Sequence, residues 1–412
     1  AAIQEANAHP GLDTIEFNIP GPGPHTISPT SALPTITQPV TIDATMENAC
    51  GQPRCVELNG AGAGANVDGL SISAGSSVVR GLAINRFRRY GIRLSTSGGN
   101  IIEGNFIGTD VSGTGDLGNT NDGVRIETSN NTIGGTVASA RNVISGNNND
   151  GVEISGNAAS GNLVQGNLIG TDAAGTGALG NSGHGVHVTT SASNNTIGGA
   201  GAGNIIAFNG GDGVFIASTG STRNRIQQNS IFSNGELGID LLPNGVNAND
   251  SGDPDTGANN RQNFPVLTSV FSGFGTTFIQ GSIDSTTANS AYPILIEFFH
   301  SPSCDPSGHG EGQTFLGSTT VSGPGSFNVT LSGSVSGGVM TATATDNNGN
   351  TSEFSACVTV QPAARLIVRK EMVGGVGAFT FTGTPSGTIS VNGGTLTAEV
   401  VPGVYTSVEG VV

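Results

Sequence analysis

Short runs in which aliphatic residues alternate with variable residues recur between Cys55 and Leu242. The commonest run is a glycine, an aliphatic residue, a variable residue and a second aliphatic residue. It begins at Gly69, Gly91, Gly123, Gly151, Gly185, Gly213 and Gly238. A period of two places alternate side chains on opposite faces of a β-strand, and no segment here has the period of an amphipathic helix. The pattern therefore predicts a series of short strands.

One stretch of this region occurs twice. Residues Gly104–Ile126 align with Gly166–Val188 at an offset of 62, and 14 of the 23 aligned residues are identical. An asparagine followed by a short apolar strand recurs at about half this offset, at Asn100, Asn131, Asn162, Asn195 and Asn224. Short strands at a fixed period predict a right-handed parallel β-helix, in which each coil buries its apolar face by stacking on the coil before it.

Glycine and asparagine recur where each coil must bend. Glycine adopts positive φ freely, and asparagine does so more readily than most residues. Stacked asparagine side chains can also hydrogen-bond to one another along the axis of the coil. We expect an interior asparagine ladder, and its candidates are Asn105, Asn147, Asn167, Asn209 and Asn229.

The pattern changes on both sides of the repeat, and the chain is predicted to be all-β apart from its start. Residues 1–9 have the spacing of a short amphipathic helix, which we expect to cover the open end of the first coil. Six or seven period-two runs follow Phe264, and their spacing of about ten residues predicts an antiparallel β-sandwich. The predicted units are a cap with the first coils (1–55), the β-helix (56–245), an acidic, Asn-rich linker (246–262), the sandwich (263–361) and a partial third β domain (365–412).

The chain is acidic and has few charged residues. Charged residues make up 11% of it, the formal net charge is −16, and Lys370 is its one lysine. Such a chain is a poor partner for nucleic acid, and no apolar run is long enough for a membrane span. We expect the one basic cluster, Arg86–Arg93, to contact acidic side chains of a neighbouring coil.

The cysteines fall into two pairs, one near the first coils and one in the later β region. We predict the disulfides Cys50–Cys55 and Cys304–Cys357, which indicate an oxidising compartment. A zinc site is the alternative, but the first pair has no histidine close by.

Several stretches carry a family resemblance. The opening Ala2–Asn7, the segment Asp13–Ile19 and the segment Leu33–Asp43, followed by the repeat itself, resemble bacterial right-handed β-helix proteins of the CSLREA-domain type. Their Cys-Ser-Leu-Arg-Glu-Ala motif is absent, so we expect an N-terminal truncation. The segment Glu297–Ser355 is similar to the Ig-like module that commonly follows, and the last segment is similar to prealbumin-like modules. The resemblance implies a secreted or surface-displayed bacterial protein and brings no catalytic residues.

Two series of positions are candidates for chemistry. The residues before each glycine run are Tyr90, Asp122, Asp150, His184, Asp212 and Leu237, and the variable residues inside the runs are Arg93, Arg125, Glu153, His187, Phe215 and Asp240. Like positions stack in a β-helix, so Asp122 and Asp150 are expected to be neighbours, as in the carboxylate pair of a glycosidase or a metal site. The alternative is that Asp-Gly only forms turns.

The variable residues are predicted to form an outward-facing ladder. In that ladder Arg125 stands opposite Glu153 as a surface ion pair. A polysaccharide lyase would need such an arginine over a groove, and a solvated face is the alternative. The catalytic residues of the enzyme hypothesis are therefore Asp122, Asp150, His184, His187 and Arg125.

Two acidic motifs complete the set. Asp250, Asp253 and Asp255, in the Asn247–Gly257 stretch, are spaced to bind calcium through oxygen ligands, and a solvated linker is the alternative. No other cofactor is expected. The repeated Gly-Thr-Asp motifs, which end at Asp110 and Asp172, are predicted to shape their loops, because a catalytic residue is usually unique.

The first hypothesis for function is a secreted or cell-surface scaffold of the structural or adhesion type, without catalytic activity. Its partner would be an unknown surface ligand, such as a polysaccharide or a host or cell-surface protein. The alternatives are a carbohydrate-active β-helix enzyme, as a polysaccharide lyase or glycoside hydrolase, and a module that binds carbohydrate or calcium. The chain has no Trp and three Tyr, and this lack of aromatic platforms weighs against the carbohydrate hypotheses.

Overall fold

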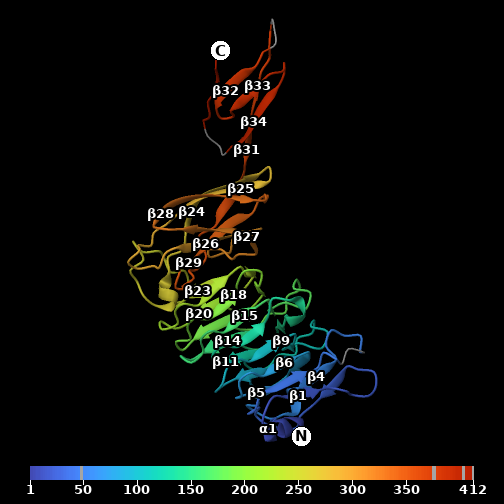
Figure 1. Cartoon of the computed structure of the whole chain (residues 1–412). Helices are drawn as coiled ribbons and strands as arrows, with labels where there is room; N and C mark the ends of the chain where they lie inside the picture. The colour runs from blue at the N-terminus through green and yellow to red at the C-terminus, as the bar shows by residue number, and fades with distance from the viewer. Residues whose placement is uncertain (47–49, 374–376, 401–403, 411–412) are drawn as a thin grey trace.

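The computed structural model describes residues 1–46, 50–373, 377–400 and 404–410, and it is an elongated β-structure (Figure 1). The helix α1 (Ala2–Ala8) lies at the N-terminal end, where it buries Ala6 against the first coil. Short 3₁₀ turns occur at η1 (Gly60–Gly62), η2 (Ala138–Ala140) and η3 (Ala258–Arg261). None of the helices in the described ranges combines the length and the hydrophobicity that a membrane crossing requires.

The described strands between Asp13 and Leu241 form three sheets, in which all neighbours are parallel. Sheet A contains β1 (Asp13–Glu16), β3 (Val40–Asp43), β6 (Val78–Arg80), β9 (Ile101–Glu103), β12 (Thr132–Gly134), β15 (Leu163–Gln165), β18 (Thr196–Gly198) and β21 (Arg225–Gln227). Sheet B contains β2 (His25–Ile27), β4 (Val56–Asn59), β7 (Leu82–Asn85), β10 (Phe106–Ile107), β13 (Val143–Ile144), β16 (Leu168–Ile169), β19 (Ile205–Ala207) and β22 (Ser230–Phe232). Sheet C contains β5 (Leu70–Ile72), β8 (Ile92–Leu94), β11 (Val124–Ile126), β14 (Val152–Ser155), β17 (Val186–Thr189), β20 (Val214–Ile216) and β23 (Ile239–Leu241). This is the right-handed parallel β-helix that the repeat predicts.

Aliphatic side chains of equivalent strands stack in the interior. On sheet B, for example, Ile107, Ile144 and Ile169 are in register and are fully buried. Burying one such side chain stabilises the fold by about 1.5–3 kcal/mol. Since the neighbours of each side chain lie on adjacent coils, this stabilisation depends on the stacking of the coils.

Asparagine side chains form ladders at the corners of the β-helix. In each ladder, the Oδ1 atom of one asparagine accepts both the backbone N–H and the side-chain amide of its counterpart one coil earlier. The described residues contain ladders of Asn100, Asn131, Asn162, Asn195 and Asn224; of Asn105, Asn142, Asn167, Asn204 and Asn229; and of Asn119, Asn147, Asn181, Asn209 and Asn234.

The single ladder expected from the sequence was wrong in its composition. Asn105, Asn167 and Asn229 belong to one ladder, whereas Asn147 and Asn209 belong to another. The expected set followed the offset of 62 residues, which spans two coils, so that it skipped the ladder members on alternate coils. The structural role predicted for these residues is confirmed, because each is almost fully buried and hydrogen-bonded.

The strands after the β-helix wrap around a second core. They are β24 (Val266–Gly273), β25 (Thr276–Ile283), β26 (Ile294–Ser301), β27 (Thr314–Val321), β28 (Gly325–Ser332), β29 (Val339–Thr345) and β30 (Val358–Pro362), with the order β27-β26-β29-β30-β24-β25-β28. The β24–β30 pair is parallel and the other pairs are antiparallel. Val270, Ile279, Phe298 and Met340 are fully buried in this core. We call this unit the sandwich.

The sandwich covers the C-terminal end of the β-helix. Ile231 on β22 exchanges backbone hydrogen bonds of 2.9 Å with Gly312. Phe354 is 2% exposed and belongs to the core of the β-helix. One oxygen of Glu353 accepts the N–H of Leu241 at 3.1 Å. The last strands of the β-helix are therefore paired and packed, with no open end in this described part of the chain.

The segment 246–262, predicted as a linker, is not a solvated connection. Asn259 on η3 is fully buried, and its Oδ1 accepts the N–H of Asn224 at 3.0 Å. It thus continues one asparagine ladder beyond the last coil. The composition of the segment resembles a linker because polar residues with turn-forming backbones also suit a cap.

Two small antiparallel sheets follow the sandwich. The strand β31 (Ala364–Arg369) pairs with β34 (Thr395–Val400), and β32 (Phe379–Gly383) pairs with β33 (Gly387–Ile389) and β35 (Ser407–Gly410). Both predicted disulfides, Cys50–Cys55 and Cys304–Cys357, are present.

Candidate functional site

The outward face of sheet C carries the predicted ladder of variable residues. The strand register aligns Arg93, Arg125, Glu153, His187, Phe215 and Asp240 on consecutive coils. The residues that precede the glycine runs lie beside this ladder. Asp122 is close to Arg125, at 3.9 Å, and Asp150 is close to His187, at 2.8 Å.

The acidic residues before the glycine runs hold the coils together. Asp122 accepts the N–H of Asp150 at 3.4 Å, and Asp150 accepts the N–H of His184 at 2.8 Å. His184 Nδ1 accepts the N–H of Asp212 at 2.9 Å, and Asp212 accepts the N–H of Leu237 at 2.8 Å. Asp122 and Asp150 are thus neighbours, as expected, but their carboxylates bond to the next coil rather than to their own turns.

Arg125 lies among three carboxylates. Its guanidinium contacts Glu153, its Nε lies 3.3 Å from Glu127, and its Nη1 lies 3.9 Å from Asp122. The Arg125–Glu153 pair is therefore confirmed. It is not the surface pair that was expected, because Glu153 is only 7% exposed. Glu153 lies between Arg125 and His187, which are in register with it on the two adjacent strands.

Burial dominates the electrostatics of these carboxyl groups. It raises the pKa of Glu153 to about 8, with a further contribution from the Asp122 carboxylate and in spite of Arg125. Burial and the Asp150 carboxylate also raise the pKa of Asp122. A Glu153 side chain that keeps its proton at neutral pH can donate a hydrogen bond or act as a general acid.

The two histidines lie on the same face, next to Phe215. The rings of His187 and Phe215 stack with centroids 5.5 Å apart, and the His184 ring lies 4.8 Å from Phe215. The structure thus brings the five predicted residues Asp122, Asp150, His184, His187 and Arg125 onto one face. Donor atoms of Asp150, Glu153 and His187 lie within 4.8 Å of one another, which is close enough for a shared metal ion.

Glu153 belongs to the series of variable residues named from the sequence, but it was left out of the catalytic set of the enzyme hypothesis and was expected only as the surface partner of Arg125. Its position in the repeat is that of an exposed variable residue, and its burial can be seen only in the three-dimensional structure. Glu236 is a second omission, since it lies outside both periodic series and approaches His184 and Asp212 only in three dimensions.

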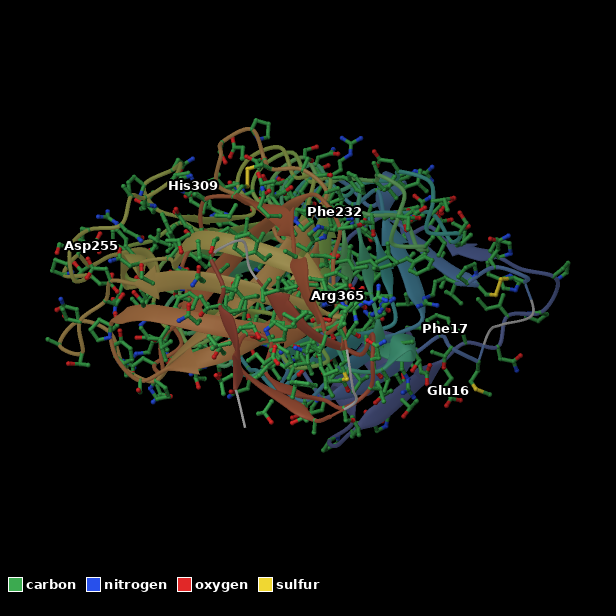
Figure 2. The ribbon with its side chains drawn as sticks, turned by 90° about the horizontal axis from the view of Figure 1, so that it is seen from above. Glu16, Phe17, Phe232, Asp255, His309 and Arg365 are labelled. Carbon is green, nitrogen blue, oxygen red and sulfur yellow. A yellow bond between two sulfur atoms is a disulfide. The ribbon has the colours of Figure 1, made fainter. Side chains whose placement is uncertain are left out.

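The predicted calcium ligands also lie close together. Donor atoms of Asp250, Asp253 and Asp255 are within 4.8 Å of one another. Figure 2 shows Asp255 at the periphery of the molecule. Asp253, however, is 5% exposed, and one of its oxygens already accepts hydrogen bonds from the side chains of Gln262, Ser285 and Ser290. Calcium binding here stays a prediction.

The repeated Gly-Thr-Asp motifs and the basic cluster have structural roles. Asp110 Oδ1 accepts the N–H groups of Thr114 and Gly115, both at 3.1 Å, and Asp172 makes the equivalent contacts in its own loop. Arg89 lies 3.7 Å from Asp68, and Arg93 lies 2.8 Å from Glu127. Both predictions are confirmed.

No family model matches the chain, and no curated protein matches it. Among solved structures, the full-length tailspike protein 2 (TSP2, ORF211) from Escherichia coli O157:H7 bacteriophage CAB120 is similar to it, with 12% identity and a TM-score of 0.16. The alignment covers 82% of this chain and 57% of that protein, so the chain spans a little over half of its length.

Proposed function

We propose that the chain is part of a secreted or cell-surface scaffold of the structural or adhesion type, and that the β-helix holds the face of sheet C toward a ligand. The observation that carries this proposal is the joint between the β-helix and the sandwich. Backbone pairing at Ile231, the buried Phe354 and the Glu353 hydrogen bond join the two units through a packed, hydrogen-bonded contact. We therefore expect the outward face of sheet C to stay at a fixed distance from the sandwich.

Two further observations support the location. Disulfides persist in oxidising compartments, which favours an extracellular protein. The resemblances to CSLREA-type β-helix proteins, Ig-like modules and prealbumin-like modules favour display on a bacterial surface.

The face of sheet C is better suited to polar recognition than to stacking on sugars. Phe215 is 7% exposed, because His184 and His187 lie against it. The ligand of such a face would offer cationic or hydrogen-bonding groups. A cell-surface protein and a polysaccharide rich in hydroxyl groups both carry such groups.

Small-angle X-ray scattering of the whole chain tests the rigid joint. We expect one extended conformation, in which the β-helix and the sandwich keep a fixed orientation. Incubation with acidic and neutral polysaccharides is expected to release no shorter products. Depolymerisation that the change Asp150→Ala abolishes would overturn the scaffold proposal.

The second candidate function is a carbohydrate-active enzyme. It is favoured by Glu153, whose pKa of about 8 suits a general acid, beside the carboxylates of Asp122 and Asp150. This candidate requires that Glu153→Gln removes activity without unfolding the protein. Failure to find any activity on a broad polysaccharide panel would speak against it.

A further inference from the structure

A second acidic site lies beyond the face described above, where the last coil meets the sandwich. A cleft of about 470 Å³ is lined by Asp212, Glu236 and Asp240 from the β-helix and by Asp305 from the sandwich. Asp212 and Asp240 come from adjacent coils. The cleft therefore collects carboxylates from both units around one solvent-filled space.

The two buried carboxylates of the cleft, Asp240 and Asp212, each have one oxygen without a hydrogen-bond donor. Asp240 is 2% exposed, and its Oδ2 accepts the N–H of Gly245 at 2.9 Å, but its buried Oδ1 has no hydrogen-bond donor. Asp212 is fully buried, and its Oδ2 likewise has no donor. A buried carboxylate oxygen without a partner is costly, so its presence at a cleft indicates a missing cation.

His184 cannot supply the missing hydrogen-bond donor to Asp212 without giving up another hydrogen bond. Its Nδ1 lies 3.1 Å from Asp212 Oδ2 and 2.9 Å from the backbone N of Asp212. One nitrogen cannot accept the N–H and donate to the carboxylate at once, so one of these polar groups stays unmatched in either tautomer.

In the described part of the chain, the basic side chain within ion-pair distance of these carboxylates is His184, which lies beside Asp212. Among the described residues, no arginine or lysine forms an ion pair with Asp212, Glu236, Asp240 or Asp305, whereas Arg125 fills this role on the neighbouring face. Burial raises the pKa of Asp240 to about 7, and the Asp212 and Glu353 carboxylates add to this. The local excess of negative charge agrees with the unmatched oxygens.

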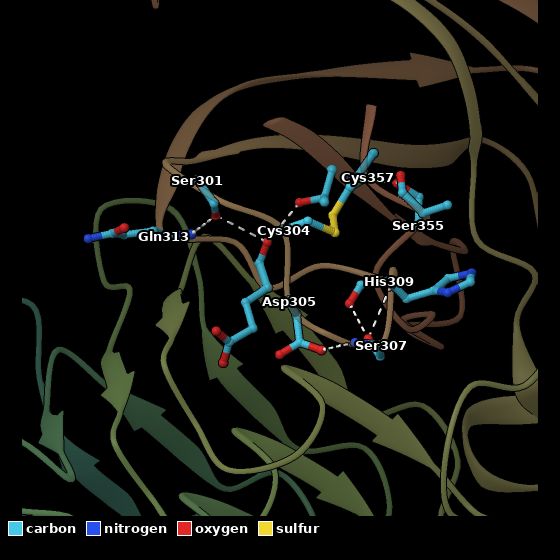
Figure 3. Close-up of a disulfide and its surroundings, with 12 residues drawn as sticks. Ser301, Cys304, Asp305, Ser307, His309, Gln313, Ser355 and Cys357 are labelled. Carbon is cyan, nitrogen blue, oxygen red and sulfur yellow. Dashed lines mark hydrogen bonds between the residues drawn. A yellow bond between two sulfur atoms is a disulfide. The ribbon is translucent and has the colours of Figure 1, made fainter. Parts of the chain in front are cut away.

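The outer wall of the cleft is held in place by a disulfide. Figure 3 shows Asp305 next to Cys304, which is bonded to Cys357. The N–H of Ser307 donates to Asp305 Oδ1 at 2.8 Å. The Asp305 carboxylate is therefore fixed at the rim, opposite the residues of the last coil.

We propose that this cleft binds a hard divalent cation of the calcium class between the β-helix and the sandwich. Donor atoms of His184, Asp212 and Glu236 lie within 4.8 Å of one another, and the carboxylates of Asp212 and Glu236 are the direct ligands. Asp240 and Asp305 complete the shell directly or through water, since calcium accepts six to eight oxygen ligands in a flexible geometry. His184 Nδ1 already accepts the N–H of Asp212, and the remaining donors around the cleft are carboxylates, which favours calcium over a zinc-like ion.

The test is calcium titration of the whole chain after treatment with a chelator, by calorimetry and by thermal unfolding. We expect one ion per chain at this site and a Tm that rises by about 5 °C at a hundredfold excess of calcium over its Kd. The double change Asp212→Asn/Asp240→Asn should weaken binding by about 100-fold or more. In the absence of calcium it should raise the Tm, because it removes the unmatched charges.

Glu236→Gln is a milder variant, since Glu236 is exposed and its replacement leaves the fold intact. It should weaken calcium binding by about tenfold. The matched control is Glu5→Gln/Glu16→Gln, which removes the same charge as the double variant from exposed positions at the other end of the molecule. It should leave binding unchanged.

Two results would overturn the proposal. The first is the absence of calcium binding at millimolar concentration. The second is binding that survives the Asp212→Asn/Asp240→Asn change but disappears in Asp250→Asn/Asp255→Asn, which would assign the ion to the segment before the sandwich.

Discussion

The interior corners of the β-helix and the outward face of sheet C follow opposite rules. At the corners the same residue, asparagine, returns on each coil from Asn100 onward, and its amide is satisfied by its neighbours. On the face the residue changes from Arg125 to Glu153 to His187 on successive coils. The corner residues are neutral, whereas the face contains buried carboxyl groups with raised pKa values.

This difference separates stability from recognition. A neutral amide ladder can be extended to any number of coils, because every new member brings both a donor and an acceptor. Buried charges bring no such benefit and cost stability when they are unmatched. Buried carboxyl groups are concentrated along the outward face of sheet C. We therefore infer that this face serves recognition, whereas the asparagine corners serve stability.

The largest effect is expected inside a ladder. Asn167→Ala removes the acceptor of the Asn142 N–H and side-chain amide, and leaves the Asn204 Oδ1 without its side-chain donor. Buried groups without partners cost about 1–3 kcal/mol each, so we expect a loss of about 4 kcal/mol in unfolding free energy. Urea denaturation measures it. The exposed Asn148→Ala is the control and should change stability by less than about 0.5 kcal/mol.

The next effect concerns Glu153 and pH. Its pKa rises from 4.5 in a model peptide to about 8 in the fold. The folded protein therefore holds the proton more tightly, and the contribution of Glu153 to stability is complete below pH 4.5 and is lost as the pH rises toward 8. Allowing for screening, unfolding free energy should fall by about 3 kcal/mol across this range, and by clearly less in Glu153→Gln. Equal slopes in both proteins would contradict the raised pKa.

Replacement of the single arginine among the carboxylates should have a smaller effect. Arg125→Met keeps much of the side-chain volume but leaves Asp122 and Glu153 without a cation, whereas Glu127 keeps its contact with Arg93. We expect a loss of about 2 kcal/mol at pH 8 and less at pH 5, where Glu153 is protonated. The exposed Arg88→Met serves as the control. A loss that does not depend on pH would mean that packing, rather than charge, explains the role of Arg125.

The smallest effect is expected in the repeated loops. Asp110→Ala and Asp172→Ala each remove an acceptor of loop N–H groups, so each should lower stability by about 1 kcal/mol. Thermal unfolding of both variants provides the measurement. A strong effect on ligand binding from one copy alone would break the rule that repeated residues are structural.

The periodic parts of the structure were predictable from the sequence. The β-helix, the alignment of Arg125 with Glu153 and the grouping of the five site candidates follow from spacing, because equivalent positions stack on adjacent coils. Both disulfides followed from the distribution of the cysteines.

The features that the sequence did not predict depend on side-chain burial and on contacts between residues that are far apart in the sequence. The burial of Glu153 depends on how neighbouring coils cover it, and spacing carries no information about this. The approach of Asp305 to Asp240 joins two units with different periods. The role of Asn259 as the continuation of a ladder lies in a stretch whose composition is that of a loop.

The closed ends of the β-helix make its length adjustable. The helix α1 covers one end and the sandwich covers the other, while the ladders between them accept any number of equivalent coils. Each coil adds about 4.8 Å along the axis, so duplication of the two-coil unit would move one end about 10 Å further from the other. The distance between the two covered ends can therefore change in steps of one coil, while α1 and the sandwich stay the same.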